Sequence, residues 1–266
     1  MVVKLHRYKK NVNQNKKNIL VTGSKGFLGT NLINFLNEVR SFNIYEFTKD
    51  SSFNDLNSII KKVDFIFHFA GVISTHNSFE EFQKSNINLT SKLIDIIQDN
   101  NLSIPILFTS SIHAKEKLGE YGRTKSESEE LLRNYSSNCN SLVYILRLPH
   151  VYGEFQKKDR GSFLTDSINN IIENKEVNMK NPNNLINYLY VQDLLTQFNE
   201  LLNSNDTKGL IYPTVKSVYK KDVGTVINFI YEINRNIYNE KFLPNGNFEK
   251  NLIKVFKFHY EALNKK

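Results

Sequence analysis

The feature of this sequence that most constrains its fold is a set of three glycines placed three residues apart. Gly23, Gly26 and Gly29 follow an apolar run at residues 18–22, and leucines recur at helical spacing after them. A short run rich in β-branched residues predicts a buried strand. Glycine is needed where a chain turns tightly and where a helix packs closely on a strand. The pattern therefore predicts a strand, a tight turn and a helix whose first N–H groups can bind a phosphate.

Short apolar runs continue to alternate with helix-like segments along the first half of the chain. Predicted strands cover residues 42–47, 63–69, 104–109 and 142–146, and predicted helices cover residues 82–98 and 124–135. Strands that alternate with helices form right-handed crossovers and a parallel sheet. We therefore expect an α/β fold, a doubly wound parallel sheet of the Rossmann type that binds a dinucleotide.

The C-terminal part of the chain has a less regular pattern. It predicts helices at residues 163–174, 191–202, 223–234 and 248–263 and a short strand at 188–190. We expect these elements, drawn mainly from residues 154–266, to form a small substrate lobe that covers the carboxyl edge of the sheet, where ligands bind. Residues 18–266 then form one NAD(P)-binding domain, and the lysine-rich residues 1–17 are expected to be a disordered basic tail.

Composition narrows the classes of protein to consider. A single cysteine, Cys139, excludes an intramolecular disulfide and a multi-cysteine metal site, and it fits a reducing compartment. No apolar run approaches the roughly 20 residues that span a bilayer, and no secretory signal is recognisable. The net charge of +8 comes from scattered residues without a nucleic-acid-binding motif. We expect a cytoplasmic protein without metal, nucleic acid or membrane partners.

The end of the second predicted strand bears on the choice of dinucleotide. An acidic residue there binds the ribose hydroxyl of NAD, whereas the extra phosphate of NADP needs space and a cation. Thr48 and Lys49 follow this strand and offer a hydroxyl and an ammonium to a phosphate. Glu46 would occupy the position that distinguishes NAD from NADP only if the predicted end of the strand were shifted by one or two residues. These residues favour NADPH over NADH.

A tyrosine and a lysine four residues apart form the candidate catalytic pair. Tyr121 and Lys125 would lie on one face of a helix, and Ser111 ends the strand before them. The phenol can give a proton to a carbonyl oxygen as a hydride reaches its carbon, and the serine hydroxyl can bind the same oxygen. A neighbouring ammonium and a nicotinamide cation are expected to lower the pKa of the phenol.

With these motifs in this order, the sequence resembles the extended short-chain dehydrogenase/reductases. It is similar, more narrowly, to the reductase domain of capsular-polysaccharide enzymes that reduce UDP-2-acetamido-2,6-dideoxy-L-hexos-4-ulose. The resembling segments are residues 22–29, 68–72, 109–114, 121–132, 147–153 and 190–195, and for the narrower group residues 181–185 and 248–252. The resemblance implies reduction of the C4 ketone of a UDP-linked 4-keto-6-deoxy sugar by NADPH for polysaccharide biosynthesis.

The resemblance also implies roles for individual residues. The catalytic residues would be Ser111, Tyr121 and Lys125, with His113 as a further candidate. The cofactor would contact Gly23, Lys25, Gly26, Phe27, Leu28, Gly29, Thr48, Lys49, Ala70, Gly71, Tyr121, Lys125 and Leu148. The substrate would contact Val72, Ser111, His113, His150, Lys158 and Arg160. Asn86 would be a structural residue near the site, and Arg147 would border the nicotinamide and the substrate.

Two departures from the family leave epimerisation at C3 open. The chain lacks the cupin domain that the bacterial enzymes carry, and His150 stands where they usually have asparagine. Epimerisation needs a base and an acid on opposite faces of the sugar, and histidine, with a pKa of about 6.5, suits either role. His113 and His150 are the candidates. Alternatively, a separate epimerase supplies this step.

Other interpretations remain at this stage. The chain can be an NAD-dependent nucleotide-sugar epimerase or 4,6-dehydratase, although dehydratases carry Asp-Glu where this chain has Ile112 and His113. It can also be a non-catalytic NADP-sensing protein. We expect a homodimer built on the helices at 85–98 and 124–135. His68 is expected to pack in the interior, and no role is assigned to His76. Glu127, Glu129 and Glu130 are expected on the solvent-exposed face of the helix predicted at residues 124–135.

Overall fold

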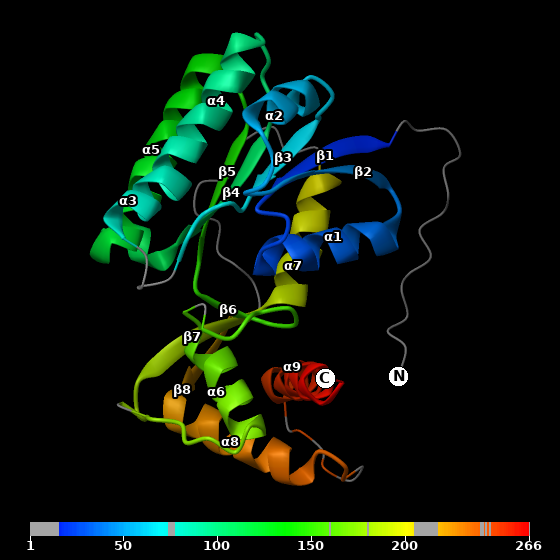
Figure 1. Cartoon of the computed structure of the whole chain (residues 1–266), viewed down its shortest axis with the longest axis vertical. Coiled ribbons are helices and arrows are strands. Elements are labelled where there is room, and N and C mark those ends of the chain that lie inside the picture. Colours follow the sequence, from blue (N-terminus) through cyan, green and yellow to red (C-terminus); the bar gives the residue numbers. More distant parts are fainter. Residues whose placement is uncertain are drawn as a thin grey trace.

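A parallel sheet of five strands forms one half of the molecule in the computed structural model (Figure 1), which describes residues 16–73, 78–159, 161–179, 181–204, 218–239, 242, 244 and 246–265. In spatial order the strands are β2 (Phe42–Phe47), β1 (Lys17–Thr22), β3 (Phe65–His68), β4 (Ile106–Ser111) and β5 (Val143–Leu148). The connections from β1 run outward to β2 and then back to β3, so the strand order reverses between β1 and β3. Ligands of doubly wound sheets bind at this point.

Helices cover both faces of the sheet (Figure 1). One face carries α1 (Phe27–Val39) and α7 (Val191–Leu202). The other carries α2 (Phe53–Ile60), α3 (Phe79–Phe82), the π-helix η1 (Gln83–Asn88), α4 (Leu89–Asp99) and α5 (Gly119–Cys139). Strand side chains alternate between faces, so Ile19 and Val21 join one hydrophobic core and Leu20 joins the other. Burial on both sides explains the continuous apolar runs that mark these strands in the sequence.

A smaller lobe lies below the carboxyl edge of this sheet (Figure 1). Its mixed sheet contains β6 (His150–Tyr152), β7 (Leu185–Tyr190) and β8 (Val218–Asp222), flanked by α6 (Phe163–Ile172), α8 (Val223–Asn236) and α9 (Asn247–Asn264). The rings of Tyr152 and Tyr188 both lie 5.6 Å from that of Phe248 on α9. These aromatic contacts fasten α9 to the small sheet and so complete the lobe.

The structure corrects several predicted boundaries. The helix expected at 82–98 is three pieces, because the chain winds into a π-helix between Gln83 and Asn88. The helix expected at 124–135 runs from Gly119 to Cys139, so Tyr121 lies within it rather than before it. Strand β4 extends two residues further than predicted and ends at Ser111.

Four elements, among them the short 3₁₀-helix η2 (Ile112–Ala114), had no counterpart in the sequence prediction. Helix α2 begins with a capping box between Ser52 and Asp55, a local signal that the apolar pattern did not reveal. Strands β6 and β8 are short, and pairing with β7 holds both of them in place. Short strands of this kind are decided by their partners rather than by their own composition.

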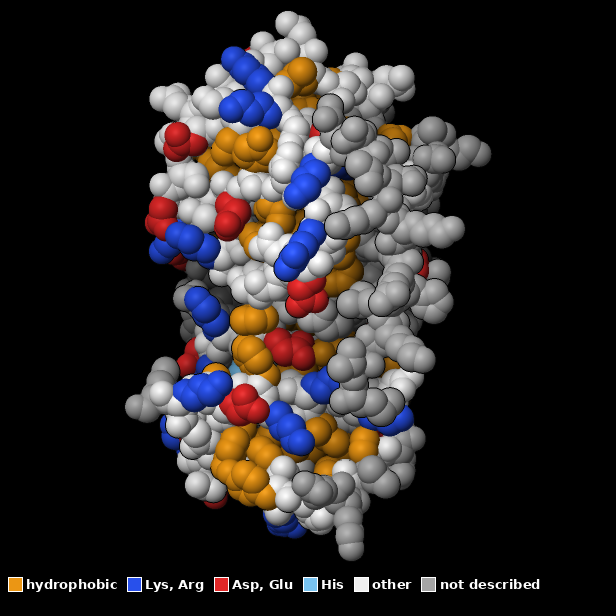
Figure 2. Space-filling view, turned by 90° about the vertical axis from the view of Figure 1, so that its right-hand side faces the viewer, with side chains coloured by type: hydrophobic (Ala, Val, Ile, Leu, Met, Phe, Trp, Pro, Cys, Tyr) orange, Lys and Arg blue, Asp and Glu red, His pale blue; other side chains and the backbone are white. Residues whose placement is uncertain are grey.

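The basic N-terminal segment ends earlier than expected. Lys17 begins β1, and its ammonium donates a hydrogen bond of 3.2 Å to the carbonyl oxygen of Leu202. Residues 1–15 of the predicted tail lie outside the described residues. On the face drawn in Figure 2, lysine and arginine side chains are spread over both lobes among acidic and hydrophobic ones.

Candidate active site

The glycine turn lies at the carboxyl end of β1, where the strand order reverses. Gly23 has a φ of +67°, a conformation that favours glycine, and its N–H donates to the Phe47 carbonyl at 2.9 Å. A Cβ on Gly29 would lie 2.6 Å from the Cα of Ser24. At all three glycines a side chain would meet backbone, so the turn, the start of α1 and the loop after β3 can approach one another closely. This turn, the glycine cradle, has the close backbone packing that pyrophosphate binding by a dinucleotide fold needs.

Helix α1 starts directly above this turn. Gly26 is its N-terminal cap and makes no side-chain cap bond, and the first turn carries no acidic residue. The Thr30 N–H donates to the Gly26 carbonyl at 2.9 Å, so the N–H groups of Phe27, Leu28 and Gly29 precede that helical hydrogen bond. The positive end of the helix therefore lies at the glycine turn, where its free N–H groups can bind a phosphate.

The residues after β2 form a tight turn. The Thr48 hydroxyl accepts the Asp50 N–H at 3.2 Å, and the exposed Lys49 lies between them. Asp50 carries the first carboxylate after the strand, and it lies 3.4 Å from the exposed ammonium of Lys25. Glu46 is paired with Val21 in the sheet register, and its side chain is exposed. The end of β2 therefore carries the Thr48 hydroxyl and the Lys49 ammonium. Lys25, from the turn after β1, pairs with the Asp50 carboxylate beside them.

The end of β3 is held by a buried asparagine. A Cβ on Gly71 would lie 2.6 Å from Oδ1 of Asn86, and that oxygen accepts the N–H of Val72 at 2.9 Å. The amide of Asn86 donates to the Thr124 hydroxyl at 3.0 Å. Asn86 thus joins the loop after β3, which begins with Ala70, to helix α5. This agrees with the structural role expected for it.

His68 packs in the interior, as the sequence indicated. Its ring lies 2.7 Å from the Thr22 hydroxyl through Nδ1 and 2.9 Å from the Thr90 hydroxyl through Nε2. Thr90 donates its own proton to the Asn86 carbonyl at 2.6 Å, so Nε2 of His68 must be the donor to Thr90. Burial, helped by Lys125, lowers the pKa of His68 to about 3. A neutral His68 therefore links the end of β1 to Asn86.

Ser111, Tyr121 and Lys125 come together at the carboxyl edge of the sheet. Ser111 ends β4 opposite Leu148 of β5, and both residues are buried. Tyr121 lies in the first turn of α5, and the Ser111 hydroxyl acts to lower the pKa of its phenol. Lys125 lies one turn further along, and its ammonium donates to the Thr109 carbonyl at 2.9 Å. The predicted trio is one cluster, next to the loop after β3.

The pKa of Tyr121 moves in the opposite direction to the one expected from the ammonium. Burial raises it to about 12, and the Ser111 hydroxyl opposes this only in part. The ammonium of Lys125 lies 6.0 Å from the centre of the phenol ring, because it is turned toward the Thr109 carbonyl and the Phe108 ring. The prediction of a lowered pKa is therefore wrong, because burial outweighs the groups that favour the phenolate, while the contribution of a nicotinamide cation stays a prediction. A neutral phenol is the form that donates a proton.

Lys125 is one of the most buried charged residues of the described chain. Burial lowers its pKa to about 8, and the negative charge of Glu129 acts in the other direction. The ammonium also lies 4.5 Å from the centre of the Phe108 ring, which attracts a cation. Lys125 therefore remains positively charged at neutral pH, close to the phenol.

The two candidate histidines approach the same region from different elements. His113 lies in the short 3₁₀-helix η2 (Ile112–Ala114), and its N–H donates to the Ser111 hydroxyl at 3.2 Å. Its ring centre is 6.4 Å from that of Tyr121. His150 begins β6 and is partly open to solvent, yet burial, and after it His113, lowers its pKa. The charge of His113 therefore acts on His150 in this region.

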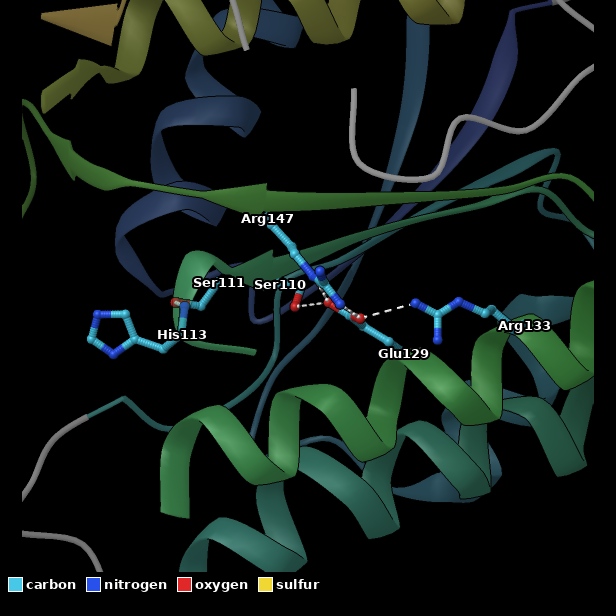
Figure 3. Close-up of polar contacts among 6 residues, drawn as sticks. All are labelled: Ser110, Ser111, His113, Glu129, Arg133 and Arg147. Carbon is cyan, nitrogen blue, oxygen red and sulfur yellow. Dashed lines mark hydrogen bonds and ion pairs between the residues drawn. The ribbon is translucent and has the colours of Figure 1, made fainter. Parts of the chain in front are cut away.

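Glu129 is the residue that the sequence analysis misjudged. It was expected on a solvent-exposed face, but its side chain is completely buried and accepts hydrogen bonds from Ser110, Arg147 and Arg133. In Figure 3 its carboxylate lies between the two guanidinium groups, while Ser111 and His113 lie together further along. The sequence offered only a partial indication, because Glu129 follows Lys125 at helical spacing and so lies on the same face of α5. The donors that surround its carboxylate come from other elements. Glu130, the next residue, is exposed as expected.

Of the two basic residues expected to contact the substrate, the structure describes Lys158 but not Arg160. Lys158 forms an ion pair with Glu173 at 2.9 Å, and Lys175 pairs with the same carboxylate. Arg160 and also His76 lie outside the described residues. Lys158 is therefore already partnered within the small lobe, so any contact with a diphosphate would have to compete with Glu173.

The sheet, the cradle and the hydroxyl–phenol–ammonium cluster occur together in extended short-chain dehydrogenase/reductases, and the described fold and site place the chain in this class of enzymes. Comparison with known sequences supports this directly. The chain belongs to the NAD dependent epimerase/dehydratase family, which it matches over residues 19–212.

The relatives of the chain include enzymes that act on nucleotide sugars. It is 34% identical over 214 residues to the UDP-2-acetamido-2,6-beta-L-arabino-hexul-4-ose reductase of Pseudomonas aeruginosa, covering 80% of this chain and 57% of that protein. The chain thus spans little more than half the length of this relative.

Solved structures have the same fold. The capsular polysaccharide assembling protein CapF of Staphylococcus aureus superposes with a TM-score of 0.80 at 28% identity, over 94% of this chain and 66% of that one. The UDP-glucuronic acid 4-epimerase of Bacillus cereus, in complex with NAD, gives a TM-score of 0.78 at 17% identity over 92% and 99% of the two chains. In the part of the chain that the structure describes, no helix is both long and apolar enough to cross a membrane.

Proposed function

We propose that the chain reduces the C4 ketone of a nucleotide-linked 4-keto-6-deoxy sugar with NADPH, the substrate being UDP-2-acetamido-2,6-dideoxy-L-hexos-4-ulose or a close relative of it. The observation that carries the proposal is that Ser111, the neutral Tyr121 phenol and Lys125 gather at the carboxyl edge of the sheet, next to the loop after β3. The substrate class follows from the 34% identity to a UDP-sugar reductase.

The proposed roles of the residues follow from their contacts. NADPH, bound along the cradle, would supply the hydride to C4. Tyr121 would donate its phenolic proton to the C4 oxygen, and the Ser111 hydroxyl would hydrogen-bond the same oxygen, so that ketone, hydride and proton give the alcohol. The Lys125 ammonium, held by the Thr109 carbonyl, would stabilise the phenolate left on Tyr121 until solvent returns the proton.

The direct test is consumption of NADPH by the purified chain with the freshly prepared UDP-4-keto sugar. Loss of absorbance of the reduced nicotinamide and an NMR spectrum of the new alcohol at C4 are the expected results. The absence of turnover with both NADPH and NADH would contradict the proposal. Binding of NADPH without turnover of any keto sugar would instead favour the non-catalytic sensing protein.

The preference for NADPH is a separate part of the proposal. It is supported by Thr48, Lys49 and Lys25 at the end of β2 and by the pairing of Asp50 with Lys25. A Lys49→Glu variant is expected to bind NADPH about tenfold more weakly and NADH with little change, because one charge-assisted contact is lost. Lys92→Glu, an exposed position on α4, is the matched control. Equal affinity of the wild type for the two cofactors would contradict this part.

A second activity, epimerisation at C3, is favoured by one specific observation. His113 lowers the pKa of His150, and His113 itself lies next to Ser111 and Tyr121. One imidazole would remove the C3 proton while Tyr121 and Ser111 stabilise the enolate oxygen, and the other would return a proton on the opposite face. Deuterium at C3 of product formed in deuterated water, lost in His113→Asn, is the expected result. Deuterium-free product would assign the step to a separate epimerase.

Assembly and location complete the proposal. We expect a homodimer formed by α4 and α5, which lie next to each other on the outer face of the sheet (Figure 1). Sedimentation as a monomer would contradict it. A cytoplasmic location is consistent with the free thiol of Cys139.

A further inference from the structure

Glu129 connects the catalytic helix to the ends of two strands. Its oxygen Oε1 accepts the Ser110 hydroxyl at 2.5 Å and Nε of Arg147 at 2.9 Å, and its other oxygen accepts Nη2 of Arg147 at 2.7 Å. Ser110 on β4 and Arg147 on β5 are partners in the sheet register. Figure 3 shows the carboxylate of α5 reaching both strand ends. One buried group therefore joins three elements.

These three elements carry the candidate catalytic groups. Helix α5 carries Tyr121 and Lys125, and Ser111 directly follows Ser110 on β4. Ser111 acts on the pKa of Tyr121 across the same gap between β4 and α5 that Glu129 bridges through Ser110. A bidentate arginine–carboxylate pair has a defined geometry, so it sets the distance across this gap. A shift of about 1 Å between reacting groups can cost about 100-fold in rate.

The same carboxylate acts on Lys125 through its charge. The groups that face the ammonium come from three elements: Glu129 and Tyr121 on α5, His68 on β3, and the Thr109 carbonyl and Phe108 ring on β4. Glu129 raises the pKa of Lys125 against the effect of burial. Its removal would also take away the carboxylate that pairs with both Arg147 and Arg133.

We propose that Glu129 is a positioning residue of this site, whose buried carboxylate fixes α5 against the ends of β4 and β5 and keeps the Lys125 ammonium charged. Glu129 acts through Ser110, Arg147 and Lys125 rather than by touching the substrate. The activity readout of this proposal rests on the proposed reductase function.

Three variants separate charge from shape. Glu129→Gln removes the charge, Glu129→Asp keeps it, and Glu130→Gln is the control at the exposed neighbouring position. The alkaline limb of the pH profile of kcat is expected to move to lower pH by about one unit in Glu129→Gln only. The reason is that Glu129 raises the pKa of Lys125, and a nearby opposite charge shifts a pKa by about one to three units. An ion pair that serves stability alone would lower the melting temperature and leave the limb unchanged, and that result would overturn the proposal.

A readout without substrate distinguishes the two possible failures. The pKa of Lys125 can be followed by NMR in protein with ¹³C-labelled lysine, with its signal assigned through Lys125→Met. A lower pKa in Glu129→Gln supports the positioning role even if the wild type turns over no keto sugar, whereas an unchanged pKa overturns it even if the reductase is active.

If Glu129→Gln does not fold, Ser110→Ala carries the test, because it removes one hydrogen bond and keeps the charge. A kcat several-fold below wild type with an unchanged alkaline limb is then the expected result, and a wild-type kcat overturns the proposal.

Discussion

Replacing Lys125 by methionine is expected to make the protein more stable at neutral pH. The pKa of Lys125 falls from 10.5 in a free side chain to about 8 in the folded protein, so burying the charged form costs about 3 kcal/mol at 1.36 kcal/mol per pKa unit. Methionine avoids this cost but leaves the Thr109 carbonyl without its donor, which costs about 1–2 kcal/mol. The net gain at pH 7 is therefore about 1–2 kcal/mol.

The pH dependence of this difference is the sharper test, because the lost hydrogen bond does not contribute to it. The folded-state pKa of Lys125 is below its unfolded value, so the unfolded chain binds the extra proton between pH 8 and 10.5. The wild type is fully destabilised by the buried charge below about pH 8 and regains stability as pH rises through this window. Lys125→Met should therefore lose about 2 kcal/mol of its relative stability between pH 7 and pH 10.

Urea unfolding followed by circular dichroism, at several pH values from 6 to 10, measures this quantity. The comparison stops at pH 10 because Tyr121 and other buried tyrosines contribute above it. Lys92→Met is the control, since Lys92 is exposed on α4. A difference between Lys125→Met and wild type that stays constant over this range would refute the argument that burial lowers the pKa of Lys125.

Three further substitutions test other parts of the site. Tyr121→Phe is expected to lower kcat for NADPH oxidation at least about 100-fold, with the fluorescence-measured cofactor Kd nearly unchanged, because only the proton donor is lost; a wild-type kcat would remove Tyr121 from the mechanism. Gly29→Ala should abolish cofactor binding, because the added Cβ meets backbone. Gly246→Ala is the control, because there the Cβ meets only the end of a flexible side chain. Equal cofactor Kd values for the two variants would contradict the role of the glycine cradle. Asn86→Ala should destabilise the protein by about 2–3 kcal/mol in urea unfolding, because it leaves the Val72 N–H without its buried acceptor; a loss below about 0.5 kcal/mol would show that Asn86 does not hold this loop.

Local requirements explain why much of the site could be predicted from the sequence. The turn at Gly23 needs a positive φ and the contact at Gly29 leaves no space for a side chain, and both requirements appear as residue types in the chain. The spacing of Tyr121 and Lys125 is that of a helical turn, whatever the helix packs against. The buried strands could be located along the chain because each is a continuous apolar run.

The pKa values of the catalytic groups could not be predicted in the same way. The sequence places an ammonium near a phenol and predicts a lowered pKa for Tyr121. Burial raises that pKa instead, because the ammonium points toward Thr109 and most of the phenol is shielded from water. Both effects depend on neighbours from other elements, which no spacing along α5 can specify.

The sequence by itself was enough to predict the doubly wound sheet, the glycine cradle and the candidates Ser111, Tyr121 and Lys125, because each leaves a pattern of residue types along the chain. Only the tertiary structure decided that Glu129 is buried and Glu130 exposed. A carboxylate on a helix stays in water unless other elements bring donors to it. Here β4 and β5 bring Ser110 and Arg147, so the same residue type becomes part of the catalytic cluster at one position and of the surface at the next.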